Sequence, residues 1–195
     1  MLVLFIITGL IVLGLKKPSL LPIILFCQAS VITIICYRSG LAVPFVVLVF
    51  TLKALIIPLL LYYIVRKIIA FNQEESVIPA PLVISLVLAL SVAAFFFTRQ
   101  LHAGPFTMAA VFTAFVGILL ITSRNTLVSQ LTGFIVLQNG IFAFTSSLYL
   151  KFTFAIELVL AIDVLLSVLF MVYAIQTIYK STGSIDIDTF NSLRG

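Results

Sequence analysis

The sequence predicts an all-α integral membrane protein with about seven transmembrane helices, and three observations support this prediction. Hydrophobic residues make up 63% of the chain and charged residues only 9%, and the mean hydropathy is +1.35. A soluble chain of 195 residues needs more polar side chains than this to cover its surface. The apolar stretches run for about 17 to 25 residues, the length of a helix across a hydrocarbon core of ~30 Å, and they lack the alternation of barrel strands.

Basic or polar residues end each apolar stretch and so delimit the predicted helices. The first stretch covers residues 1–15 and ends before Lys16 and Lys17. The second covers about 19–37 and ends before Arg38. The third covers about 41–65 and ends before Arg66 and Lys67. A polar loop with Glu74 and Glu75 comes next. The remaining stretches cover about 80–98 before Arg99, 105–122 before Arg124, 127–149 before Lys151, and 153–179.

The prolines agree with these boundaries. Six of the seven lie between the stretches or in a first helical turn, where a missing N–H costs little: Pro18, Pro22, Pro44, Pro79, Pro81 and Pro105. Pro58 lies inside the helix predicted at 41–65. We expect it to kink this helix, because it leaves the carbonyl of Ala54 without its donor.

The distribution of basic residues predicts the orientation of the chain. Seven Lys and Arg residues fall on one side of the predicted helices and three on the other. The positive-inside rule therefore places the N-terminus outside and the C-terminus in the cytoplasm. The net charge of +5 is spread over the helix ends rather than gathered in a patch, so we expect the lipid bilayer and no nucleic acid as a partner.

A weak internal repeat divides the chain into two halves. We predict an N-terminal three-helix half (1–67), a polar loop with a connecting helix (68–104), a C-terminal three-helix half (105–180) and a cytoplasmic tail (181–195). Gln28 corresponds to Gln138 and Lys53 to Asp163, both at an offset of 110. The halves would then be parallel repeats, because a shift of four helices preserves direction.

Three ionisable residues, Lys53, Glu157 and Asp163, fall inside the predicted helices. A charge at the bilayer centre costs roughly 2.5–3.5 kcal/mol, so we expect all three to face other helices or internal water. One interpretation is a structural ion pair between Lys53 and Asp163. The other is a proton path, because ionisable groups held away from water can exchange protons near neutral pH. The two interpretations are compatible.

Amide side chains accompany these charges. Gln28 and Gln138 lie at the midpoints of their helices, and Asn139 follows Gln138. Such amides can bond between helices, or hold and orient water. The sequence contains no nucleophile–base pair, no phosphate-binding loop and no cluster of metal ligands. We therefore predict no catalytic, cofactor or metal site in this chain.

Several short motifs resemble the hydrogenase-4 component E family. They are Cys27-Gln28-Ala29-Ser30, Leu52-Lys53-Ala54 up to Pro58, Leu137-Gln138-Asn139-Gly140, Glu157, Ile162-Asp163-Val164, and the tail from Thr182 to Gly195. Together they extend over nearly the whole chain. The C-terminal half is similar to the K subunit of complex I and to the C subunit of multisubunit cation/proton antiporters. In those relatives, carboxylates on two neighbouring helices form part of a proton path.

The resemblance implies a role for some of these residues. Glu157 matches the second carboxylate of the proton path. The first falls at Gln138, where the family has Glu before Asn-Gly, and because glutamine cannot ionise, this departure puts a two-carboxylate relay in doubt. Asp163, or water held by Gln138, would be the substitute.

The function implied by the resemblance is that of a non-catalytic membrane subunit in a group 4 [NiFe] hydrogenase or formate hydrogenlyase-like complex of the prokaryotic cytoplasmic (inner) membrane. It would contribute to H⁺ or Na⁺ translocation coupled to electron transfer. Its partners would be antiporter-like membrane subunits and a hydrogenase-type peripheral arm, and these would hold the NiFe centre and the iron–sulfur clusters. The alternatives are a structural linker between antiporter-like subunits, a subunit of a multisubunit cation/proton antiporter, and a stand-alone transporter.

Overall fold

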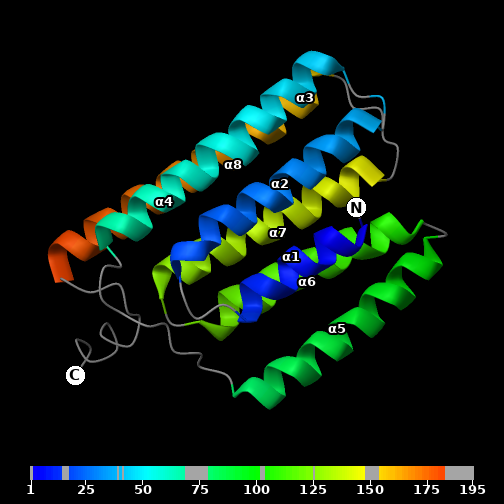
Figure 1. The fold of residues 1–195 in the computed structure, drawn as a ribbon, viewed down its shortest axis with the longest axis horizontal. Helices are drawn as coiled ribbons and strands as arrows, with labels where there is room; N and C mark the ends of the chain where they lie inside the picture. The colour runs from blue at the N-terminus through cyan, green and yellow to red at the C-terminus, as the bar shows by residue number, and fades with distance from the viewer. Residues whose placement is uncertain are drawn as a thin grey trace.

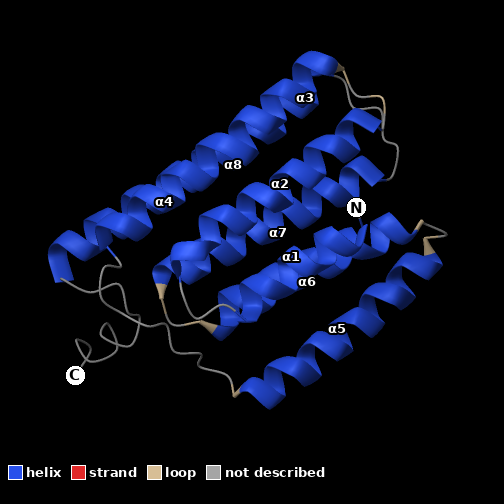
Figure 2. Ribbon diagram, viewed as in Figure 1, coloured by secondary structure: helices blue, strands red, loops and turns tan. Residues whose placement is uncertain are grey.

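The structure is a computed structural model, and it describes residues 2–14, 18–38, 40, 42–68, 79–101, 104–124, 126–147 and 154–182. All the elements in these ranges are helices (Figures 1 and 2). The predicted all-α fold is therefore confirmed. The loop with Glu74 and Glu75, and residues 183–195 of the predicted tail, lie outside the described residues.

The helices agree with the predicted apolar stretches to within about three residues at each end. They are α1 (Leu2–Gly14), η1 (Pro18–Leu20), α2 (Leu21–Arg38), α3 (Val43–Val49), η2 (Phe50–Ile56), α4 (Ile57–Ile68), α5 (Ala80–Gln100), α6 (Pro105–Ser123), α7 (Leu127–Ser147) and α8 (Phe154–Thr182). One boundary needs correction. The tail was predicted from residue 181, but α8 continues to Thr182.

Most of these helices are long enough to cross a membrane. Within the described residues, five spans have the required length and apolar character: Leu21–Arg38, Val43–Tyr63, Pro81–Gln100, Pro105–Ser123 and Leu127–Ser147. α8 is 29 residues long, or about 43 Å, and its section Leu165–Lys180 is apolar. α1 has 13 residues and rises about 20 Å, less than the ~30 Å of a hydrocarbon core.

The prolines lie where the sequence predicts them. Pro44, Pro81 and Pro105 each occupy the first turn of a helix. Around Pro58 the chain forms one continuous helix of three parts, in which the π-helical η2 separates α3 from α4 (Figure 1). In η2 the N–H of Ile57 donates to the carbonyl of Leu52, five residues earlier. The irregularity near Pro58 thus takes the form of a wider helical turn, and the kink itself stays a prediction.

The helices form two layers in which each N-terminal helix packs on a C-terminal counterpart (Figure 1). α1 packs on α6, α2 on α7, and both α3 and α4 on α8, whereas α5 packs against α6 at the edge of the bundle. The paired positions differ by a nearly constant offset, as in the contacts Gln28–Asn139 (111) and Cys36–Ser146 (110). Paired helices therefore run parallel, as two copies of a three-helix unit would.

Glycines bring the backbones of α6 and α7 into direct contact. A Cβ atom at Gly117 would meet the backbone of Leu137, and one at Gly140 would meet the backbone of Ala114. Small residues allow such close approach between membrane helices. The contact fixes α7 against α6, and Gly140 lies next to Asn139, so it also fixes the position of that amide.

Candidate functional site

Lys53 is a buried charge in the middle of its helix. Its side chain is 4% exposed and projects from the π-helical η2. The Nζ atom donates a hydrogen bond of 3.2 Å to Oδ1 of Asn139 on α7, and it lies 4.5 Å from the centroid of the Phe142 ring. Asn139 and Phe142 are three residues apart and so share a face of α7. An amide oxygen and an aromatic ring face therefore replace the water that would solvate the ammonium group.

A second amide extends this contact to α2. Nδ2 of Asn139 donates a 3.2 Å hydrogen bond to Oε1 of Gln28, which is fully buried. Lys53, Asn139 and Gln28 thus form a polar chain that joins η2, α7 and α2, in which Lys53 donates to Asn139 and Asn139 donates to Gln28. At its end, the buried Nε2 of Gln28 makes no hydrogen bond with any residue that the structure describes.

Apolar side chains surround the polar chain. The cluster includes Phe45, Val49, Cys36 and Phe142, and the rings of Phe45 and Phe142 are 6.2 Å apart. Hydrogen bonds in such low-dielectric surroundings are stronger than in water, and unpaired polar groups there are costly. We therefore expect the geometry of the polar chain to be tightly held.

Only one member of the polar chain can change its charge. Lys53 can bind or release a proton, whereas Asn139 and Gln28 can only donate, accept and orient. A neutral lysine amine keeps two N–H donors, so the bond to Asn139 can persist in both protonation states. The arrangement can hold a cation inside the membrane and let it lose its proton without breaking the structure.

The structure brings together some of the predicted site residues and separates others. Lys53, Gln28 and Asn139 meet, but Gln138 is only half-buried and takes no part in the polar chain. Asp163 is exposed on α8 and forms no ion pair with Lys53, although both belong to the described residues. The interpretation of Lys53 and Asp163 as an ion pair is therefore wrong. The ammonium group of Lys53 donates its hydrogen bond to the amide oxygen of Asn139 instead. Glu157 belongs to α8, but its side chain lies outside the described residues.

Two contacts of this region were missed in the sequence. Phe142 could have been found, because it lies three residues after Asn139 on the same helical face. The sequence indicates a role for Arg124 only in the charge bias that sets the orientation of the chain. Arg124 is buried, and its Nη2 donates a 2.8 Å hydrogen bond to the carbonyl of Leu13 at the end of α1. The short link between α6 and α7 keeps this side chain at the helix ends.

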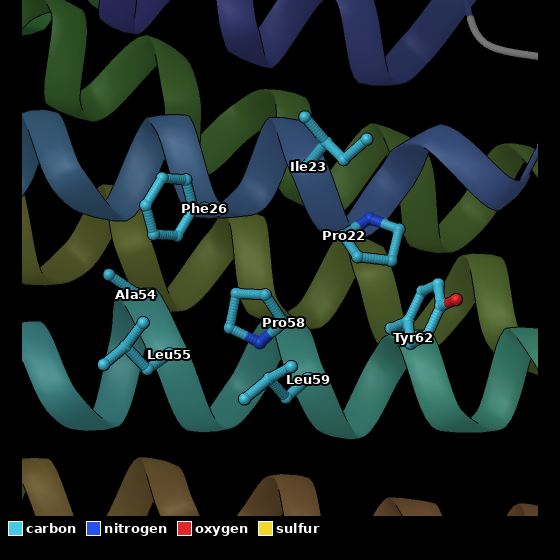
Figure 3. Close-up of a pocket in the computed structure, with 8 residues that line it drawn as sticks. All are labelled: Pro22, Ile23, Phe26, Ala54, Leu55, Pro58, Leu59 and Tyr62. Atoms are coloured by element: carbon cyan, nitrogen blue, oxygen red, sulfur yellow. The ribbon is translucent and has the colours of Figure 1, made fainter.

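An apolar groove lies between α2 and the η2–α4 helix (Figure 3). Its volume is about 370 Å³, and it is lined by Pro22, Ile23, Phe26, Ala54, Leu55, Pro58, Leu59 and Tyr62. Ile23 and Leu59 are exposed at its rim, and the buried Ala54 lies next to Lys53 in sequence. The groove opens away from the bundle, so it offers a surface for apolar chains rather than for chemistry.

The fold and this site define a class of protein, a polytopic helical membrane protein with a buried lysine–amide chain. The sequence is 26% identical over 153 residues to hydrogenase-4 component E of Escherichia coli K12, and the match covers 75% of this chain and 70% of the relative. The same protein of Escherichia coli O157:H7 and that of Shigella flexneri match equally well. The resemblance to the hydrogenase-4 component E family is thereby confirmed. No family model matches the chain. No solved structure matches it significantly.

Proposed function

We propose that this chain is a membrane subunit of a hydrogenase-type assembly related to complex I, and that it contributes to the movement of H⁺ or Na⁺ coupled to electron transfer in partner subunits. The relatives supply the first part of the proposal, because their name is that of a hydrogenase component. The observation that carries the second part is the buried chain of Lys53, Asn139 and Gln28.

The energetic cost of this polar chain supports a role in ion movement. Helix packing does not need a buried charge, because well-packed apolar residues often serve as well or better. Ionisable residues inside membrane helices commonly mark ion or proton paths. The π-helical turn that carries Lys53 adds to the argument, since π-bulges are frequent at functional sites.

The proposed proton path differs from the two-carboxylate relay of the related small subunits, because its central titratable group is Lys53. Gln138 cannot ionise, whereas Lys53 is a buried member of the polar chain that can. Glu157 would be a second proton-binding position along α8. The NiFe centre and the iron–sulfur clusters would belong to partner subunits. The assembly would lie in the prokaryotic cytoplasmic membrane, with antiporter-like membrane subunits and a hydrogenase-type peripheral arm as partners.

The test is to purify the tagged chain from membranes of its own host, identify what co-isolates, and measure ion uptake by the reconstituted complex. We expect antiporter-like subunits and a hydrogenase-type module, and we expect Lys53→Met to lower uptake at least tenfold while assembly stays normal. Thr51→Val, an exposed substitution on the same η2 segment, is the matched control and should leave uptake unchanged. Isolation of the chain alone, or full uptake by an assembled Lys53→Met complex, would refute the proposal.

A structural linker is the second candidate, and one observation favours it. The same three side chains tie η2, α7 and α2 together, so they would also hold a rigid bridge between larger subunits. In that case Lys53→Met should reduce the amount of assembled complex, and the complex that does assemble should take up ions at the normal rate.

A further inference from the structure

The outward face of α8 carries a regular stripe of exposed side chains. We call it the α8 seam, and it consists of Asp163, Leu166, Phe170, Tyr173 and Thr177. The opposite face of the helix is buried in the bundle through Val168, Val172 and Ile175. α8 lies along one edge of the bundle behind α3 and α4, opposite the edge formed by α5 (Figure 1). The α8 seam therefore faces away from the rest of the chain.

The spacing of the α8 seam is that of a helix-packing surface. Successive members are alternately three and four residues apart. The seam therefore has a seven-residue repeat, with one series at positions 163, 170 and 177 and the other at positions 166 and 173. Apolar side chains at this spacing form the seam of a coiled coil. The large members are strongly exposed, with Leu166 at 60%, Phe170 at 73% and Tyr173 at 68%. A second helix can thus pack along the whole stripe.

Asp163 shows that lipid alone does not cover this face. The midpoint of Phe154–Thr182 is residue 168, so Asp163 lies about 7.5 Å from the middle of the helix, within the ~15 Å half-thickness of a hydrocarbon core. Charged residues at this depth face a bundle interior, internal water or a partner. Here the side chain points outward, and none of the residues that the structure describes bonds to it.

We infer that the α8 seam is the docking surface for a transmembrane helix of a different subunit, which presents a basic or hydrogen-bond-donating side chain to Asp163. Charge complementarity selects this occupant. Two copies of this chain have the same orientation in a membrane, so a symmetric contact through the seam would place Asp163 against Asp163. Like charges at that position would repel, and a second copy is therefore disfavoured.

This inference rests on the proposed function only in that the chain is a subunit of a membrane assembly. It requires neither ion movement nor a hydrogenase module. The identity of the partner tests the proposed assembly, and the presence of a partner at the α8 seam tests the inference, so the two can fail separately.

The experiment is photo-cross-linking in the membranes of the native host. A photoreactive phenylalanine analogue replaces Phe170 in the α8 seam. The matched control places the analogue at Leu88, which is 62% exposed on α5 at the opposite edge of the bundle. We expect one discrete adduct from position 170 that contains a different membrane protein and that position 88 does not give. Asp163→Lys in the same chain should lower the yield of this adduct about tenfold or more, and Asp163→Asn should lower it less.

Each outcome decides the inference. A discrete adduct with a different subunit that depends on the charge at position 163 supports it. An adduct with a second copy of this chain, or adducts with lipid alone, would overturn it. An adduct that persists unchanged in Asp163→Lys would overturn the role given to charge complementarity. Should Asp163→Lys reduce the amount of chain in the membrane, yields are compared per chain and the Asp163→Asn variant decides.

Discussion

Nζ of Lys53 on η2 lies 3.2 Å from Oδ1 of Asn139 on α7, and this hydrogen bond joins the two halves of the bundle at membrane depth. The lysine belongs to the N-terminal half and the amide to the C-terminal half. The predicted internal repeat matches Lys53 to Asp163 and Gln28 to Gln138, but the two members of each pair are not equivalent in the structure. Gln28 joins the polar chain, whereas Asp163 faces outward.

The first prediction concerns the unequal effect of removing either partner. Asn139→Leu leaves the buried ammonium of Lys53 without its acceptor, and it should lower the free energy of unfolding by about 1.5–3 kcal/mol. Lys53→Met leaves only a neutral amide oxygen unpaired and also removes a desolvated charge. We expect Lys53→Met to change the stability by less than about 1 kcal/mol. Thermal unfolding in detergent measures both.

The double variant completes this comparison. Lys53→Met with Asn139→Leu removes the charge together with its partner, so its loss of stability should be smaller than that of Asn139→Leu alone. Gln138→Leu, the adjacent residue on α7 outside the polar chain, is the control and should shift the stability by about 0.5 kcal/mol or less. If the single losses simply add in the double variant, the bond between Lys53 and Asn139 does not stabilise the fold.

Much of the fold could be predicted because membrane helices leave a simple signal in sequence. Apolar length and the basic residues at helix ends locate the helices to within a few residues. The pairing of α1 with α6 and of α2 with α7 was only suggested, by the offset between Gln28 and Gln138. The close contact between the antiparallel helices α6 and α7 depends on the fit at Gly117 and Gly140, and hydropathy does not report such fit.

The site could be predicted only in part, for a physical reason. Depth along a helix can be counted from sequence, and it correctly places Lys53, Gln28 and Asn139 at the same level. The direction in which a side chain points depends on which face of the helix is buried. Nearly every residue of these helices is apolar, so no polar face marks the outside. This is why Asp163 was expected to point inward and why Gln138, rather than Asn139, was expected to occupy the centre of the site.

The second prediction tests the close contact of α6 and α7. Gly140→Ala places a methyl group against the backbone of Ala114, which cannot move aside as a side chain can. We expect a loss of about 1–3 kcal/mol in the free energy of unfolding. We also expect weaker ion uptake, because α7 would shift Asn139 away from Lys53. Thermal unfolding and uptake by the reconstituted complex measure these effects.

Gly9→Ala is the matched control for this prediction. Its added methyl group would meet the nearest side-chain atoms, those of Val116 and Thr113, at 3.9 to 4.0 Å, which is ordinary van der Waals contact. Since alanine also favours a helix more than glycine does, this variant should be stabilised by about 0.5–1 kcal/mol. Equal destabilisation of Gly9→Ala and Gly140→Ala would show that the backbone contact has no special weight.

The third prediction concerns Arg124, whose Nη2 donates to the carbonyl of Leu13 at a distance of 2.8 Å. The last carbonyls of a helix have no partner within the helix, so a buried guanidinium there satisfies the end of α1 and favours its dipole. Arg124→Met should free the last turn of α1 and raise hydrogen exchange there at least tenfold, while α6 and α7 stay protected. Arg99→Met, an exposed change at the end of α5, should leave exchange in α1 unaltered. The cap should matter because α1 is short and has little apolar length of its own to hold it in the membrane. If hydrogen exchange in α1 is unchanged in Arg124→Met, α1 is held by its packing on α6 and not by this cap.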